Sequence, residues 1–395
     1  MGNNRHRIRV LCSLLLFAAV GCDFFVPQTS SGGGGGNNTG DYIYVGNGNN
    51  TFVAGFAVGS TGALSVLTNS PYNNGVAVIC SAITPGNHFL YAGTTSGIFI
   101  YAINSNGSIT VQNGGKIAAQ DVVPTAMEVD STGTYLLAAG VSTSFTTQAI
   151  GIYQIDSTTG LLTALNGTPL PLYTGKASTP TVLTPTAMLI TPNNSYVFVS
   201  LASLGVQILT LGSGGVLGAG SAPSILPPFS TSSSPSDYGL ASDPNSSFLF
   251  VGEFNTGLRV LSIGTGGSLK EVSGSPYSVG TGPAGVILDS TGSYVYVANK
   301  GSNSISAFTF IAASGQLTPI SGSPFSSGGQ LPIAFVNDNS KKYLAVINSG
   351  SNGSGGNSDL QLFKFDSTTS GKLDPVAAAT TGTEPTNPQS LAATH

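Results

Sequence analysis

A segment of some fifty residues recurs along this chain and limits the folds open to it. The copy at 283–325 contains four short runs, at Pro283–Leu288, Tyr294–Ala298, Ser304–Phe310 and Gln316–Ile320. These runs are rich in β-branched and aromatic residues and are bounded by Gly, Asn and Ser clusters, which is typical of strands and turns. Each copy therefore predicts a small sheet of four strands.

Seven copies follow one another when the chain is aligned on its aromatic strand. They begin at Tyr42, Phe89, Tyr135, Tyr196, Phe248, Tyr294 and Tyr343, so that successive starts lie 46 to 61 residues apart. This period, with four strands in each copy, indicates a β-propeller. The longest interval contains Pro169–Pro185, which we interpret as an extended loop between blades.

The two ends of the repeat region complement each other. A strand and a turn precede six of the aromatic strands, but only Gly-rich sequence precedes Tyr42. The missing strand is present at the other end of the chain, at 388–393. We therefore predict an all-β fold over residues 41–395: a seven-bladed propeller of four-stranded antiparallel blades, closed by residues 388–393 pairing into the N-terminal blade. Closure leaves no exposed sheet edge between the two ends.

Charged residues are scarce and argue against one class of partner. They form 7% of the chain, against roughly a quarter in an average soluble protein. Three of the arginines, Arg5, Arg7 and Arg9, lie in the N-terminal segment described next. No basic stripe remains to neutralise phosphates, so we expect no nucleic-acid partner.

The N-terminal segment has the organisation of a bacterial export signal. A basic stretch is followed by an apolar run at Val10–Val20, and the small residues Ala19-Val20-Gly21 precede Cys22. This end resembles a lipoprotein box, which predicts a signal peptide at 1–21 and a lipidated Cys22. Residues 22–40 would form a Gly-rich tether. The alternative is an ordinary signal peptide that is cut nearby. We expect an exported lipoprotein of the bacterial cell envelope, held at the membrane by its lipid anchor alone.

The repeats also resemble a known family. The pattern YVYVAN…SISAFTF…GQLTPISGSPF is similar to the YVTN-type repeats of lactonase-like seven-bladed propellers. That group includes bacterial 6-phosphogluconolactonase-like proteins and fungal carboxymuconate-cyclising enzymes. The resemblance covers about residues 41–395 and implies the propeller fold and, as an expectation, lactone hydrolysis. Repeat residues build the scaffold rather than the site, so the motif says little about chemistry.

Glu128 departs from the other copies of its own repeat. The equivalent position of the first strand is apolar in every other copy, being occupied by Ala82, Leu189, Ala241, Ile287, Val336 and Ala392. A carboxyl group among such neighbours is expected to be partly buried with a raised pKa, which makes Glu128 a candidate catalytic residue. The alternative is that its side chain points into a wet central channel without a catalytic role.

Glu253 and Arg259 are the other candidate catalytic residues. Glu253 replaces the Asn that ends the aromatic strand in three other copies, and Arg259 is the one Arg that follows the signal segment. The geometry of a β-hairpin would bring the two together. They could form a structural ion pair, or Arg259 could hold an anion with Glu253 as its acidic partner.

Loops between the second and third strands should share one mouth of the ring with the loops between blades. Propellers commonly bind ligands at such a mouth. The candidate rim residues there are Asp121, Lys176, Asp237, Tyr238, Glu253, Lys300 and Glu384.

Other catalytic motifs are absent from the sequence. The chain has neither a Gly-x-Ser-x-Gly elbow nor an HExxH motif, and His88 falls at a hairpin turn. Cys80 stands where other copies have Ala or Gly, so we expect a buried thiol there. We expect no cofactor and no metal site.

These observations favour a binding propeller displayed at the cell envelope, with a protein, glycan or small molecule as its unidentified ligand. The alternative is a lactonase-like hydrolase that opens a sugar or carboxylic-acid lactone. Such an enzyme needs a base to activate water and donors to hold developing negative charge. A spacer role in the envelope stays open as well.

Overall fold

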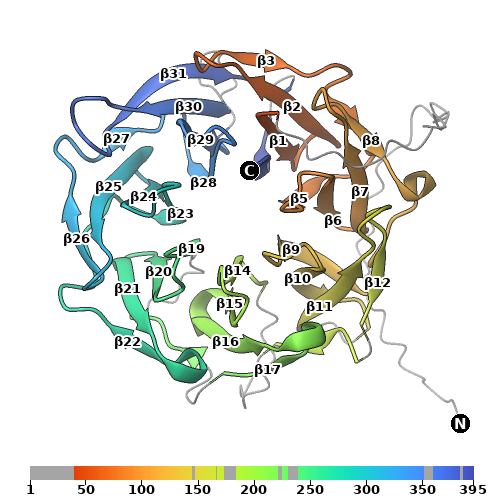
Figure 1. The fold of residues 1–395 in the computed structure, drawn as a ribbon, viewed down its shortest axis with the longest axis horizontal. Coiled ribbons are helices and arrows are strands. Elements are labelled where there is room, and N and C mark those ends of the chain that lie inside the picture. The colour runs from red at the N-terminus through yellow and green to blue at the C-terminus, as the bar shows by residue number, and fades with distance from the viewer. Residues whose placement is uncertain are drawn as a thin grey trace, which may run out of the picture. The chain divides into compact units, whose positions relative to one another are not determined.

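The computed structural model describes residues 40–144, 147–165, 167–172, 184–220, 225–229, 239–350, 359–382 and 386–395. The predicted signal peptide and all of the tether before Gly40 lie outside these ranges. Within them, seven antiparallel sheets are arranged as blades around a central axis (Figure 1). The predicted seven-bladed β-propeller is confirmed.

The inner half of each blade consists of two strands. The first strand lies next to the axis, and these strands are β5 (Val78–Ile83), β9 (Val122–Val129), β14 (Ala187–Ile190), β19 (Gly239–Ser242), β23 (Pro283–Leu288), β28 (Pro332–Asn337) and β32 (Pro388–Ala393). The second strands begin at the seven aromatic positions of the repeat and are β1 (Tyr42–Asn47), β6 (Phe89–Thr94), β10 (Tyr135–Ser142), β15 (Tyr196–Ser200), β20 (Phe248–Glu253), β24 (Tyr294–Asn299) and β29 (Tyr343–Asn348).

The outer half of each blade holds the third and fourth strands. The third strands are β2 (Phe52–Val58), β7 (Gly97–Ile103), β11 (Gln148–Ile155), β16 (Val206–Leu211), β21 (Gly257–Ile263), β25 (Ser304–Ile311) and β30 (Leu360–Phe365). The fourth strands are β3 (Leu64–Val66), β8 (Ile109–Val111), β12 (Leu162–Ala164), β17 (Leu217–Ala219), β22 (Leu269–Glu271), β26 (Gln316–Pro319) and β31 (Leu373–Ala379).

Several shorter elements were not expected from the repeat. Four two-residue strands pair with the third strand of their blade: β4 (Tyr72–Asn73), β13 (Leu170–Pro171), β18 (Ile225–Leu226) and β27 (Phe325–Ser326). Short 3₁₀ turns are η1 (Asn113–Gly115), η2 (Ala202–Leu204), η3 (Ser213–Gly215) and η4 (Thr265–Gly267). Strand β13 lies inside the predicted loop Pro169–Pro185, most of which falls outside the described residues.

The two ends of the propeller sequence share one blade, as predicted. Strand β32 pairs antiparallel with β1, and Tyr44 stands opposite Ala392. The backbone N–H of Tyr42 also donates a hydrogen bond to Oγ1 of Thr394, at 2.9 Å. Because β1 and β32 come from opposite ends of the propeller sequence, their pairing closes the ring.

Aspartates fix the hairpin turns between the first and second strands. In Asp289, Oδ1 accepts hydrogen bonds of 2.8 Å from the backbone N–H groups of Ser293 and Tyr294. Oδ1 of Asp130 and of Asp243 each bind the same pair of N–H groups in their own turns. A carboxylate that satisfies these donors holds the turn rigid, which positions the inner strand that precedes it.

Aromatic side chains join neighbouring blades. The hydroxyl groups of Tyr44, Tyr91 and Tyr296 donate hydrogen bonds to the carbonyls of glycines in the outer hairpin of the next blade, at 2.7 to 3.0 Å. One of these glycines, Gly371, has φ +77° and lies against the ring of Tyr294, so a side chain at that position would be strained and would clash. The repeated aromatic and glycine positions are therefore explained by packing between blades.

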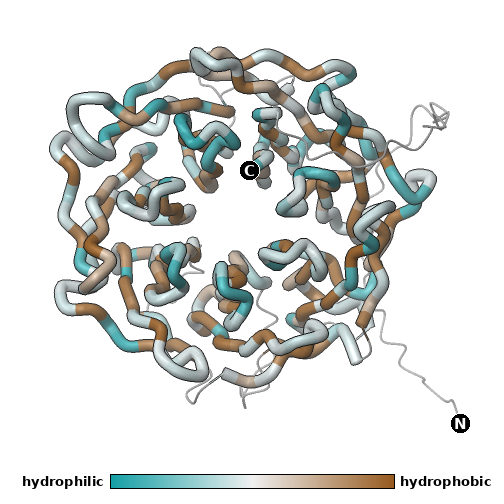
Figure 2. The backbone as a smooth tube through the Cα atoms, in the orientation of Figure 1, coloured by the Kyte–Doolittle hydropathy of each residue, from teal (hydrophilic) through white to brown (hydrophobic). Residues whose placement is uncertain are grey.

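Apolar residues lie along the strands of every blade, and hydrophilic residues concentrate in the connections (Figure 2). The apolar clusters form between blades. For example, Phe250 of β20 packs against Phe310 of β25, with ring centroids 5.1 Å apart. Among the described residues, no helix is long and apolar enough to cross a membrane.

Candidate functional site

Strand register places Glu128 in a ring of equivalent positions. Glu128 of β9 pairs with Leu137, the third residue of β10. The third residue of every other second strand pairs with one of the predicted equivalents: Ala82, Leu189, Ala241, Ile287, Val336 and Ala392. All seven positions lie in the described residues, and Glu128 is the one carboxylate among them.

The carboxyl group of Glu128 contacts the next blade. Its Oε2 accepts a hydrogen bond of 2.7 Å from the backbone N–H of Ile190 in β14. Burial raises the pKa of Glu128 to about 8, although the hydrogen bond from Ile190 acts in the opposite direction. A carboxyl group with this pKa is largely protonated at neutral pH and can exchange a proton near it.

Glu128 lines a hollow near the propeller axis. The hollow has a volume of about 430 Å³ and is formed by the inner strands β9, β14, β19 and β23 with three of the turns that follow them. Its lining therefore includes the end of the inner strands where the aspartate-fixed turns begin. Its size suits a small molecule.

Two carboxylates line this hollow, but their situations differ. Besides the two N–H groups on Oδ1, Asp289 uses Oδ2 to bind the backbone N–H and the hydroxyl of Thr291. Glu128 has one hydrogen-bond donor on one oxygen. No Lys or Arg is among the residues that line the hollow. Glu128 is consequently the carboxyl group that can take part in acid–base chemistry there.

Glu253 and Arg259 are in contact, as hairpin geometry predicts. Nη1 of Arg259 lies 3.2 Å from Oε2 of Glu253, and these side chains are 6% and 1% exposed. Both Nε and Nη2 of Arg259 donate to Oε1 of Glu271 in β22, at 2.7 and 2.5 Å. Arg259 is thus held by two carboxylates inside the blade.

This ion-pair network binds the connection between the fourth blade (β14–β17) and the fifth (β19–β22). Oε2 of Glu253 accepts a hydrogen bond from the N–H of Phe229 at 3.0 Å, and Arg259 donates one to the carbonyl of Pro227 at 3.0 Å. The Glu253 side chain is itself buried, and its charge is compensated by Arg259 and by the N–H of Phe229. This geometry fits a structural ion pair.

The predicted rim is described only in part. Asp121 accepts a hydrogen bond of 2.7 Å from the hydroxyl of Tyr153, and the backbone N–H of Lys300 donates one to the carbonyl of Gly282. The structure does not unite the two residues in one cavity with Glu128. The remaining rim candidates, Lys176, Asp237, Tyr238 and Glu384, lie outside the described residues.

Cys80 is a buried free thiol, as predicted, with 7% of its surface exposed. Burial raises the pKa of Cys80 and keeps the unreactive thiol form. Within the described residues there is no group of three or more His, Cys, Asp or Glu side chains that could hold a metal ion.

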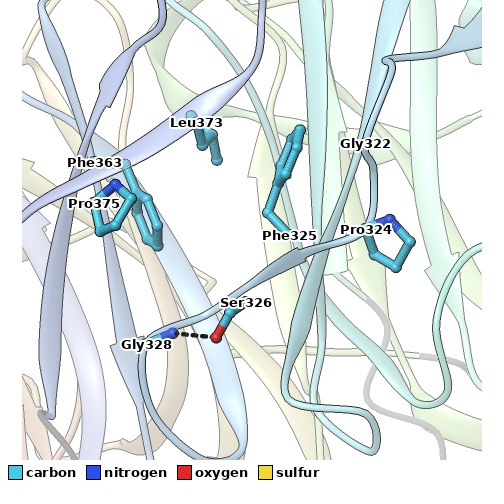
Figure 3. A pocket seen from close by; sticks show the side chains of 8 residues that line it. All are labelled: Gly322, Pro324, Phe325, Ser326, Gly328, Phe363, Leu373 and Pro375. Atoms are coloured by element: carbon cyan, nitrogen blue, oxygen red, sulfur yellow. Dashed lines mark hydrogen bonds between the residues drawn. The ribbon is translucent and has the colours of Figure 1, made fainter.

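A second hollow is lined by β27 and the turn before it in the sixth blade (β23–β26) and by β30 and β31 of the seventh (β28–β31) (Figure 3). It has a volume of about 280 Å³, and Phe325, Phe363 and Leu373 are among the residues that line it. One boundary earlier, Tyr277 occupies the position of Phe325, and its hydroxyl accepts a hydrogen bond of 3.2 Å from the N–H of Leu317. The groove beside Phe325 carries no comparable hydroxyl and holds no titratable group.

A comparison with protein families gives one match. Residues 234–388 match the model of the family described as lactonase, seven-bladed β-propeller. The resemblance to lactonase-like propellers is thereby confirmed. The matched segment contains Glu253 and Arg259 but not Glu128. No curated protein matches the sequence.

Solved structures of several bacterial proteins share the fold. A candidate 6-phosphogluconolactonase from Bacteroides fragilis is 17% identical, with a TM-score of 0.65 over 94% of this chain and 100% of that one. The periplasmic gluconolactonase of Pseudomonas aeruginosa is 16% identical, with a TM-score of 0.65 over 90% and 99%. A Lactobacillus plantarum protein is 18% identical, with a TM-score of 0.67 over 90% and 100%. Identities this low establish a common fold and no common activity.

Two residues that line the hollow were not singled out from the sequence. Ser242 and Leu288 line the hollow and directly follow positions of the Glu128 ring. Their side chains do not indicate a functional site. Their backbone N–H groups do, because these lie on the edge of the inner strands that pairs with no other strand.

Proposed function

We propose that this protein hydrolyses an uncharged lactone in the hollow beside the propeller axis, with Glu128 as its acid–base group. The observation that carries the proposal is a carboxyl group of raised pKa, about 8, in a hollow of about 430 Å³. Perturbed carboxyl groups in hollows of this size are common at active sites. The lactonase family match, which covers Ser242 and Leu288 of the hollow but not Glu128, supports the same chemistry.

The chemistry requires one proton to move twice. Ionised Glu128 takes a proton from water while the water oxygen bonds to the lactone carbonyl carbon. The ring C–O bond then breaks, and the leaving oxygen takes the proton back from Glu128. The product is a hydroxy acid, and Glu128 is again ionised.

The charge of the hollow indicates the class of substrate. No Lys or Arg lines it, so no side chain there offsets the charge of a phosphate or carboxylate, and Glu128 in its ionised, reactive form repels such a group. Arg259 is already engaged by Glu253 and Glu271. An uncharged sugar lactone therefore suits the hollow better than a phosphorylated one.

The alternative, a binding propeller of the cell envelope, stays a prediction. The same hollow could hold a neutral ligand without converting it. Lipidation at Cys22, and with it the position at the envelope, is likewise a proposal that rests on the N-terminal sequence.

Gluconolactone hydrolysis by the purified protein, compared with Glu128→Gln, tests the proposal. A rate above that in buffer that depends on Glu128 supports it. A rate equal to that in buffer contradicts it, and binding of gluconolactone without turnover would favour the binding propeller.

A further inference from the structure

The inner strands carry one edge that pairs with no other strand. In the described sheets, β14, β19 and β23 each stand at the end of their blade and pair only with the second strand. Adjacent residues of a strand direct their N–H groups to opposite sides. The orientation of an unpaired N–H group therefore follows from that of its neighbour.

In the blades of β14, β19 and β23, the residue that directly follows the inner strand directs its backbone N–H group into its own sheet. The N–H groups of Thr191, Asp243 and Asp289 donate to carbonyls of their own second strand. The residues one position earlier, Ile190, Ser242 and Leu288, must then direct their N–H groups to the free edge.

Two contacts agree with this orientation. The N–H of Ile190 donates to Glu128 of the preceding blade. The carbonyl of Leu288 accepts a hydrogen bond of 2.9 Å from Nδ2 of Asn337 in the following blade. In both cases the backbone groups at this position face away from their own sheet.

At Ser242 and Leu288 the repeat supplies no acceptor equivalent to Glu128. Glu128 belongs to the blade that precedes the blade of Ile190. In the blade that precedes that of Ser242, the residue equivalent to Glu128 is Leu189. In the blade that precedes that of Leu288, the equivalent residue is Ala241. Aliphatic side chains cannot accept a hydrogen bond. Ser242 and Leu288 nevertheless line the same hollow as Glu128.

We propose that the backbone N–H groups of Ser242 and Leu288 form an oxyanion hole for the reaction at Glu128. This inference rests on the proposed lactone hydrolysis. As the water oxygen bonds to the carbonyl carbon, the C=O electron pair moves to the carbonyl oxygen, and the two N–H groups bind the resulting negative charge. When the ring C–O bond breaks, the carbonyl re-forms and the leaving oxygen takes the proton held by Glu128. Backbone donors suit this role because the sheet holds them fixed.

Proline at position 242 removes one donor without removing the strand. Proline is tolerated on the unpaired edge of a sheet, because its missing N–H would not have paired there. Ala393 holds the same position in β32, does not line the hollow, and its neighbour Thr394 directs its N–H into the sheet, so Ala393→Pro is the matched control. We expect kcat for gluconolactone to fall about 100-fold in Ser242→Pro, with little change in KM, and to stay near wild type in Ala393→Pro. Equal kcat in the two folded variants would overturn the proposal.

A second measurement covers the case in which Ser242→Pro does not fold. The full chain, isotopically labelled at serine and leucine amides, is titrated with gluconolactam, whose carbonyl oxygen accepts hydrogen bonds but whose ring is not opened. We expect the amide proton signals of Ser242 and Leu288 to move downfield as the lactam binds. Saturation with both signals unmoved would overturn the proposal.

The two proposals fail in different ways. Turnover that depends on Glu128 but not on the Ser242 N–H would leave the hydrolase standing and remove the oxyanion hole. No turnover in the wild-type protein would remove the hydrolase, whatever the amide signals show.

Discussion

The backbone N–H of Ile190 donates a 2.7 Å hydrogen bond to Oε2 of Glu128, which joins the inner strands of the third and fourth blades. The bond fixes the position of the one carboxyl group in its ring of seven. It also reveals which backbone groups of the inner strands face away from their sheets. The site and the proposed oxyanion hole both follow from this contact.

Glu128 should make the stability of the protein depend on pH in an unusual direction. Because burial raises the pKa of Glu128 from its ordinary value of 4.5 to about 8, its ionisation opposes folding. The stability that neutral Glu128 provides is complete below about pH 4.5 and is lost as pH rises to 8. We expect Glu128→Gln, which keeps an acceptor for Ile190, to be more stable than wild type by up to about 5 kcal/mol at pH 9 and equal at pH 4. Urea unfolding at both pH values measures this, and a constant difference would contradict it.

The buried ion-pair network should matter for folding. Replacing Arg259 by Met leaves Glu253 buried without its cation, and breaking such a pair costs about 3 to 5 kcal/mol. Glu253→Gln should cost less, because Gln can still accept hydrogen bonds from Phe229 and Arg259. Denaturant unfolding of the two variants measures the order. A loss below about 1 kcal/mol in Arg259→Met would show that the network is dispensable.

A pair of reciprocal substitutions tests the contacts between outer strands. The hydroxyl of Tyr277 accepts from the N–H of Leu317 and donates to the carbonyl of Ser273 at 3.3 Å. Its loss in Tyr277→Phe should cost about 1 kcal/mol. Phe325→Tyr places a hydroxyl in the groove of about 280 Å³ shown in Figure 3 and should stabilise the protein by a similar amount. Thermal unfolding would contradict this if Phe325→Tyr were destabilising.

The lipoprotein proposal predicts a change in location. Cys22→Ala removes the thiol that would carry the lipid, so the protein should move from the membrane fraction to the soluble fraction of the host cell. Cys12→Ala, inside the predicted signal peptide, is the matched control and should not alter the fractionation. Membrane retention of Cys22→Ala equal to that of wild type would rule out the anchor.

The sequence was sufficient to predict the fold because the repeat supplies its own alignment. The start of every second strand, the closing strand at 388–393 and the equivalence of Glu128 to Ala82 and Leu189 all follow from residue types at a regular spacing. The additional two-residue strands were missed because two-residue pairings carry no periodicity. These short strands form only where the chain, after its fourth strand, runs back along the third strand of the same blade.

The site was less accessible to sequence analysis. Glu128 stood out because a charged residue replaced apolar equivalents. Whether Glu253 would be exposed depended on contacts made only in the folded chain: the N–H of Phe229 donates to Glu253, and the carbonyl of Pro227 accepts from Arg259. The N–H groups of Ser242 and Leu288 were invisible because every residue except proline has one. Only the pairing of the strands reveals which of them face the hollow.

The measurement that bears most directly on the account is the pH dependence of gluconolactone hydrolysis by the purified full chain and by Glu128→Gln, each corrected for hydrolysis in buffer. Glu128 must be ionised to act as a base, and burial places its pKa at about 8. The account predicts a wild-type kcat/KM that rises up to about pH 8 and then levels off, and a loss in kcat/KM of at least about 100-fold with no inflection in Glu128→Gln. Wild-type turnover no faster than buffer, or a pH profile unchanged in Glu128→Gln, would contradict it.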